Sequence, residues 1–77
     1  MAERLTFEYD RVGDILYIQK CPPYAAQHSE ELGDDVIART NPENGEIEGL
    51  EVLFFTRRLN DRPVLDLPIS AQLRLAV

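Results

Sequence analysis

The chain has 77 residues and a formal net charge of −6, and its single cysteine, Cys21, excludes an intramolecular disulfide bond. A domain of this size buries only ~60% of the surface of its unfolded chain, so self-association is a favoured source of stability. Residues 1–56 contain 12 acidic and 4 basic residues, whereas residues 57–77 contain 2 and 4. This acidic first part disfavours nucleic-acid binding and favours a basic protein partner.

The N-terminal residues MAERLTFEYD lack the apolar stretch of a signal peptide. The longest apolar run, LEVLFF, contains a glutamate and is far too short to cross a membrane. We therefore expect a cytoplasmic protein without a membrane segment and without a cofactor.

The first part of the chain predicts a β-hairpin. Residues 5–10 (LTFEYD) alternate between apolar and polar, which is typical of a half-buried strand, and DILYIQK has the composition of a second strand. Between them, RVGD contains Gly13 and predicts a tight turn. We expect Asp10 to accept a hydrogen bond from the backbone two residues further on.

The middle of the chain predicts further strands. Pro22 and Pro23 interrupt the chain after the hairpin, because proline cannot donate to a sheet. Residues 25–32 (AAQHSEEL) are ambiguous but compatible with a polar edge strand. After the turn GDD, DVIART predicts a strand, and the turn NPENG leads into the strand GEIEGLEVLFF.

The last part of the chain is different in character. RRLNDRP is polar, and ISAQLRLAV is compatible either with about two turns of helix that carry Ile69, Leu73 and Ala76 on one side or with extended chain docked on the sheet. The expected fold class is mainly β, α+β at the margin: a small antiparallel β-meander sheet of four or five strands with a short C-terminal helix or ordered tail. Residues 1–59 are expected to form this sheet domain, and residues 60–77 an extension that packs on the sheet or on a second subunit.

Three segments of the sequence resemble one small family. YDRVGDILYI, SEELGDDVIA and NGEIEGLEVL, in this order and spacing, resemble the bacterial domain-of-unknown-function family 2283 over about residues 6–59. The most specific positions are Tyr9, Asp10, Tyr17, Ser29, Glu30, Gly45, Gly49 and Glu51. The resemblance implies a compact β-rich domain with no assigned activity. Because some members sit beside small toxin-like proteins, it also implies a possible partner of that kind.

Glu46, Glu48 and Glu51 form the main cluster of acidic residues in a predicted strand. In an uninterrupted strand, Glu51 lies among apolar side chains and needs a hydrogen-bond partner. The candidates for this partner are Tyr17, Ser29, Arg39 and Arg57. A β-bulge at Gly49 and Leu50 instead places all three glutamates in a solvated row.

Two kinds of function are compatible with these residues. We expect a non-enzymatic protein-interaction module. The alternative is a small-ligand or divalent-cation binding protein, or an enzyme, that uses Glu51 and neighbouring carboxylates. The candidate site for this alternative consists of Glu51, Glu48, Glu46, Tyr17 and Ser29. A chain of this length leaves little room for a cleft between two catalytic carboxylates, which favours the first kind.

Phe54 and Phe55 point to opposite faces if the last strand continues through them, so something must cover the second face. The cover is either the tail of residues 64–77 or a second copy of the chain. We expect a homodimer in which residues 57–77 take part. The candidate interface consists of Phe54, Phe55, Leu65, Leu67, Ile69 and Leu73.

Overall fold

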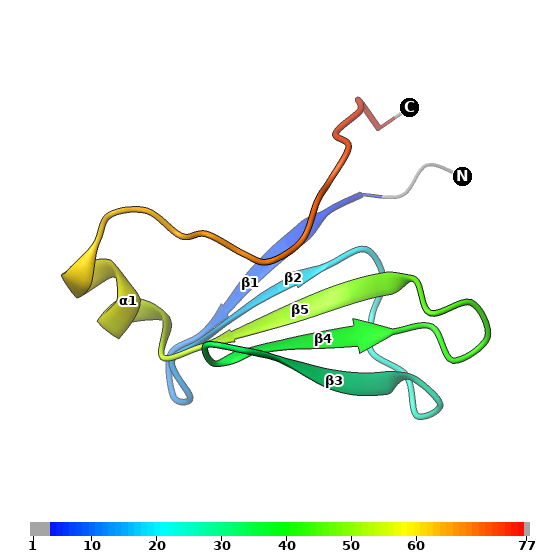
Figure 1. Ribbon diagram of the computed structural model, residues 1–77, viewed down its shortest axis with the longest axis horizontal. Coiled ribbons are helices and arrows are strands. Elements are labelled where there is room, and N and C mark those ends of the chain that lie inside the picture. The colour runs from blue at the N-terminus through cyan, green and yellow to red at the C-terminus, as the bar shows by residue number, and fades with distance from the viewer. Residues whose placement is uncertain (1–3, 77) are drawn as a thin grey trace.

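The computed structural model describes residues 4–76, which form a five-stranded antiparallel sheet, one short helix and a long C-terminal tail (Figure 1). The elements are β1 (Thr6–Asp10), β2 (Ile15–Gln19), β3 (His28–Gly33), β4 (Val36–Thr40), β5 (Ile47–Leu53) and α1 (Phe55–Asp61). The expected mainly-β class is confirmed, and the ambiguous polar segment before the turn GDD forms the edge strand β3.

The order of the strands in the sheet differs from that of a sequential meander. The order is β1-β2-β5-β4-β3, and every neighbouring pair is antiparallel. Because β5 lies between β2 and β4, the chain leaves β2 and passes to the far edge of the sheet before β3 begins. Residues 20–27 make this passage at the same end of the sheet as the turn between β4 and β5 (Figure 1).

Local interactions explain two of the hairpin turns, the one between β1 and β2 and the one between β3 and β4. The Asp10 Oδ1 atom accepts hydrogen bonds from the backbone N–H groups of Val12 (3.0 Å) and Gly13 (3.3 Å), which confirms the expected turn. Between β3 and β4, Asp34 and Asp35 have φ angles of 53° and 59°. Two successive positive φ angles let a two-residue turn match the twist of the strands that it joins.

The alternation of side chains along the strands gives the sheet two different faces. On one of them, here called the tail-side face, the buried core consists of Val36, Ala38, Leu50 and Val52, and Leu67 and Ile69 of the tail pack against it. The opposite face, here called the open face, follows from the strand registers. It carries Thr6, Glu8, Asp10, Ile15, Tyr17, Gln19, Ser29, Glu31, Ile37, Arg39, Glu51 and Leu53.

The tail is extended, which is the second of the two expected alternatives for ISAQLRLAV. It turns back after α1 and runs along the sheet (Figure 1). The docking of Leu67 and Ile69 against the core explains the extended form, because it buries apolar side chains that a free helix of this length leaves exposed. Within residues 4–76, no helix is long and apolar enough to cross a lipid bilayer.

The helix lies earlier in the chain than expected, in the segment whose polar composition indicated a break. The strand β5 ends at Leu53, and Phe54 takes a left-handed conformation with φ 54°. Phe55 then begins α1 and packs against the ring of Tyr9, with the ring centroids 5.9 Å apart. The expectation that Phe54 and Phe55 occupy opposite faces of a strand is therefore wrong.

Asp14 connects the first hairpin to the beginning of α1. Its carboxylate accepts hydrogen bonds from the Tyr9 hydroxyl (2.7 Å) and from the Thr56 hydroxyl (2.8 Å). The hydrogen bond from Tyr9, followed by those from Thr56, lowers the pKa of Asp14 in spite of an opposing desolvation effect. Together with the hydrogen bond from the backbone N–H of Phe55 to the Asp14 carbonyl, this contact ties the beginning of α1 to the first turn.

We expect Leu67→Ala to lower the free energy of unfolding by about 2 kcal/mol, because the lost side chain packs against the core. Leu73→Ala is the matched control, since Leu73 is 81% exposed, and its effect should stay below about 0.5 kcal/mol. Urea denaturation followed by circular dichroism measures both. Equal stabilities of the two variants would contradict the docking of the tail.

Candidate functional site

The register of β5 decides the positions of the three glutamates. Arg39 of β4 faces Gly49, but the next residue, Thr40, faces Ile47, so Glu48 is the extra residue in β5. The irregularity therefore does not lie at Gly49 and Leu50. Gly49 is also absent from the glycines with positive φ, which are Gly33 and Gly45. A bulge is thus present, but at Glu48, and the expected position at Gly49 and Leu50 is wrong, as is the expected solvated row that includes Glu51.

Glu51 is a buried carboxylate with a defined partner. It lies on the open face and is 9% exposed, because the side chains of the neighbouring strands surround it. Tyr17 of β2 and Ile37 of β4 face it directly. Its Oε2 atom forms an ion pair with the Nη2 atom of Arg39. The strand is therefore interrupted at Glu48, yet Glu51 is buried and paired with Arg39, which is the environment that the uninterrupted-strand alternative gave it.

The other candidate partners of Glu51 have different positions. Tyr17 lies beside it, and burial, followed by the negative charges of Glu51 and Asp10, raises the pKa of the Tyr17 hydroxyl. Ser29 is exposed on β3, where it faces Arg39. Arg57 lies over the ring of Phe54, 5.3 Å from its centroid.

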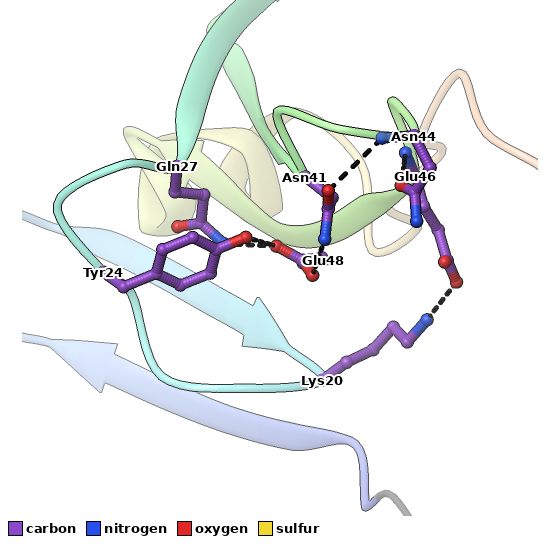
Figure 2. A network of polar contacts seen from close by, with 7 residues as sticks. All are labelled: Lys20, Tyr24, Gln27, Asn41, Asn44, Glu46 and Glu48. Atoms are coloured by element: carbon purple, nitrogen blue, oxygen red, sulfur yellow. Dashed lines mark hydrogen bonds and ion pairs between the residues drawn. The ribbon is translucent and has the colours of Figure 1, made fainter.

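Glu48 holds the passage of residues 20–27 against the sheet (Figure 2). Its carboxylate accepts hydrogen bonds from the Tyr24 hydroxyl (2.5 Å), from Gln27 Nε2 (3.1 Å) and from Asn41 Nδ2 (3.2 Å). The hydrogen bond from Tyr24 is the main cause that lowers the pKa of Glu48. The same bond raises the pKa of Tyr24 to about 12. Sequence reasoning missed this network, because its donors lie on two loops that are distant from each other in the sequence.

Glu46 has a third, separate environment. It is exposed, and its Oε1 atom lies 2.6 Å from the Nζ atom of Lys20 (Figure 2). The three carboxylates are thus directed at three different sets of partners, whereas a hard cation needs several oxygen ligands around one point. In the part of the chain that the structure describes, no group of three or more His, Cys, Asp and Glu side chains is placed to hold a metal ion.

The open face has the composition of a binding surface. Its centre consists of Ile15, Tyr17, Ile37 and Leu53, all half-buried, and its rim carries the acidic side chains of Glu8, Asp10 and Glu31. The tail runs over the other face, so these apolar side chains remain accessible. An apolar centre within a polar rim is typical of protein–protein interfaces. The signal was present in ILYI and VIA, where apolar residues occupy both faces of a strand.

A hollow of about 540 Å³ lies on the open face near the β1 edge. It is lined by Glu8, Tyr9, Asp10, Tyr17, Gln19, Pro23 and Arg39. The Nε atom of Arg39 is buried and has no acceptor among residues 4–76. The hollow is therefore lined by two carboxylates and by a guanidinium that is already paired with Glu51.

The candidate interface residues of the last part of the chain divide into two groups. Leu67 and Ile69 pack on the core of their own chain, and Leu65 is half-buried. Phe55 packs against Tyr9, whereas Phe54 and Leu73 are exposed.

Comparison with known proteins finds one family whose model matches this chain. The family model described as "Protein of unknown function (DUF2283)" matches residues 6–55, which include all five strands. No curated protein and no solved structure matches the chain. The match covers the open face and the Glu48 network, and it ends where α1 begins.

We expect Glu51→Gln to lower the free energy of unfolding by about 2 kcal/mol, because it leaves the Arg39 guanidinium without a counter-charge. The loss is smaller than for a fully buried pair, since the Arg39 side chain is 30% exposed. Glu46→Gln is the matched control, and its exposed pair with Lys20 should contribute less than about 1 kcal/mol. Chemical denaturation at pH 7 measures both, and similar losses for the two variants would refute the structural importance of Glu51.

We expect the stability difference between the wild type and Tyr24→Phe to depend on pH. The lowered pKa of Glu48 means that the hydrogen bond stabilises the fold above the pKa of an unfolded glutamate, near pH 4, and that this contribution is lost as the pH falls through the lower folded value. The raised pKa of Tyr24 means that the contribution is also lost as the pH rises from about 10 towards 12. Urea denaturation of both proteins over this range measures the difference. An unchanged difference from neutral to strongly acidic pH would contradict the role of Glu48.

Proposed function

The chain belongs to this family of proteins of unknown function, DUF2283, and from that premise we propose that it is a non-enzymatic protein-interaction module that binds a basic partner through its open face. The observation that carries the proposal is the half-buried apolar centre of that face, around Ile15, Tyr17 and Ile37. A second protein that covers this centre removes apolar surface from water, which is the main source of affinity in such interfaces.

The open face is well ordered for binding. All its side chains project from hydrogen-bonded strands, and the ion pair between Glu51 and Arg39 crosses from β5 to β4 in its middle. A surface that is already ordered loses little conformational entropy when a partner binds. This arrangement supports recognition of a shape rather than chemical conversion of a substrate.

The charge of the rim supports a partner with a basic surface. Glu8, Asp10 and Glu31 surround the apolar centre, and Glu51 neutralises Arg39. Such a rim attracts a positively charged protein during encounter and repels the phosphates of nucleic acid. A small toxin-like protein with a basic surface, the kind of partner that the family resemblance implies, fits these requirements in the cytoplasm.

The alternative of a cation-binding protein or an enzyme based on Glu51 has less support. A reactive carboxylate has to be accessible, whereas Glu51 is buried and already paired with Arg39. Glu46 and Glu48 are directed away from it toward Lys20 and Tyr24. A titration with Ca²⁺, Mg²⁺ and Mn²⁺ followed by NMR tests this alternative, and saturable shifts at these three glutamates would revive it.

The test of the proposal uses two neighbouring glutamates whose side chains lie on opposite faces of the sheet. Glu31 faces Ile37 and lies on the open face, whereas Glu30 faces Ala38 and lies on the tail-side face. Both are exposed, so Glu31→Lys and Glu30→Lys change the net charge equally with little effect on folding. Partners are first identified by affinity capture from the native host, and their binding is then measured by isothermal titration calorimetry.

We expect the captured partner to be basic and its affinity to fall roughly fivefold with Glu31→Lys, corresponding to about 1 kcal/mol. Glu30→Lys should change the affinity less than twofold. Equal effects of the two variants, or a captured partner that is acidic, would refute binding through the open face.

A further inference from the structure

Within the described residues 4–76, no strand pairs with the outer edge of β1, and this strand carries apolar side chains. β1 pairs with β2 on one side and is the first strand of the sheet. Leu5, Phe7 and Tyr9 are exposed on its tail-side face, and Phe7 is 62% exposed. An exposed edge that presents free backbone groups and apolar side chains is a template for another strand.

The other edge of the sheet is different. β3 carries the adjacent acids Glu30 and Glu31, and its pairing with β4 shifts register between Glu31 and Gly33. Charges and irregular register are two of the means by which proteins prevent a strand from adding to an edge. The pairing of β1 with β2 is regular over all five residues of β1. The sheet is thus protected at one edge and not at the other.

We propose that β1 pairs antiparallel with β1 of a second copy of this chain, with Phe7 opposite Phe7 at a two-fold axis. The two five-stranded sheets then form one continuous sheet. This inference goes beyond the proposed function, because it uses an edge of the sheet and leaves the apolar centre of the open face accessible.

The register centred on Phe7 is complementary at every described position. In an antiparallel pair centred on Phe7, a residue that precedes Phe7 in one copy faces the residue that follows Phe7 by the same number of positions in the other copy. The two facing side chains lie on the same face of the sheet. The facing pairs are Leu5 with Tyr9, Arg4 with Asp10, and Thr6 with Glu8, each occurring twice. The apolar pairs lie on the tail-side face, and the polar pairs lie on the open face. Two arginine–aspartate pairs thus flank the axis at its ends.

Other registers are less favourable. Centring the pair on Glu8 places the two Glu8 carboxylates against each other and Thr6 against Asp10, which leaves Arg4 outside the strand. Like charges directly opposite each other destabilise a strand pair. Centring it on Thr6 aligns only residues 4–8 of each copy within the described part of the chain and leaves Tyr9 without its apolar partner.

The first test introduces a charge at the axis. Phe7→Lys places two ammonium groups next to each other in the dimer, whereas Val12→Lys changes the charge equally in the first turn, where Val12 is 99% exposed. We expect the wild type and Val12→Lys to sediment as dimers at 100 μM and Phe7→Lys to sediment as a monomer with an unchanged circular dichroism spectrum. A monomeric wild type, or a Phe7→Lys protein that remains dimeric, would overturn the proposal.

The second test determines the register and does not depend on the loss of Phe7. In a Cys21→Ser background, Thr6→Cys and Glu8→Cys are made as separate proteins and oxidised alone and as a mixture. The Phe7-centred register predicts a disulfide-linked dimer in the mixture only, because residue 6 of one copy faces residue 8 of the other. Cross-linking of either protein alone, or none in the mixture, would overturn this register. Neither test involves Glu31, so their failure is distinguishable from failure of the proposed function.

Discussion

Because β5 lies between β2 and β4, the chain has to pass around the end of the sheet after β2, and much of the remaining structure depends on this passage. The connection of residues 20–27 contains two prolines and forms no strand. A backbone hydrogen bond from the N–H of Lys20 to the carbonyl of Glu48 attaches its beginning, and the Glu48 carboxylate accepts two further hydrogen bonds from it, from Tyr24 and Gln27. The extra residue in β5 at Glu48 allows its carboxylate to reach donors on the passage and on Asn41. The extra residue in β5 therefore also anchors the connection between β2 and β3.

Glu46, Glu48 and Glu51 show how position rather than residue type determines the role of a carboxylate. Glu46, one residue before β5 begins, forms an exposed ion pair with Lys20. Glu48 is a hydrogen-bond acceptor for loop side chains, and Glu51 is a buried partner of Arg39. Each of the three carboxylates thus has its own partners. The surfaces of the molecule that are open to a partner are consequently the open face of the sheet and the edge of β1.

Local patterns in the sequence were sufficient for the strands, for the Asp10 turn and for the mainly-β class, because alternation and turn chemistry act between near neighbours. They did not determine the order of the strands, since the pairing of β5 with β2 depends on residues thirty or more positions apart. They predicted neither the position of the extra residue nor that of α1. Phe54 ends β5 in a left-handed conformation that its residue type does not favour, and Asp14 on a distant turn stabilises the chain there. The apolar residues on the second face of β2 and β4 are visible in the sequence, but a local pattern does not show which face the tail covers.

The acidic and irregular edge of β3 has a consequence for the size of any assembly. A sheet with two receptive edges can add copies without limit and grow into a fibre, whereas a sheet with one receptive edge can join only one further copy. When two β1 edges meet, both outer edges of the joined sheet are β3 edges, where Glu30 and Glu31 repel their counterparts. The charge pattern of β3 thus makes such an assembly self-limiting.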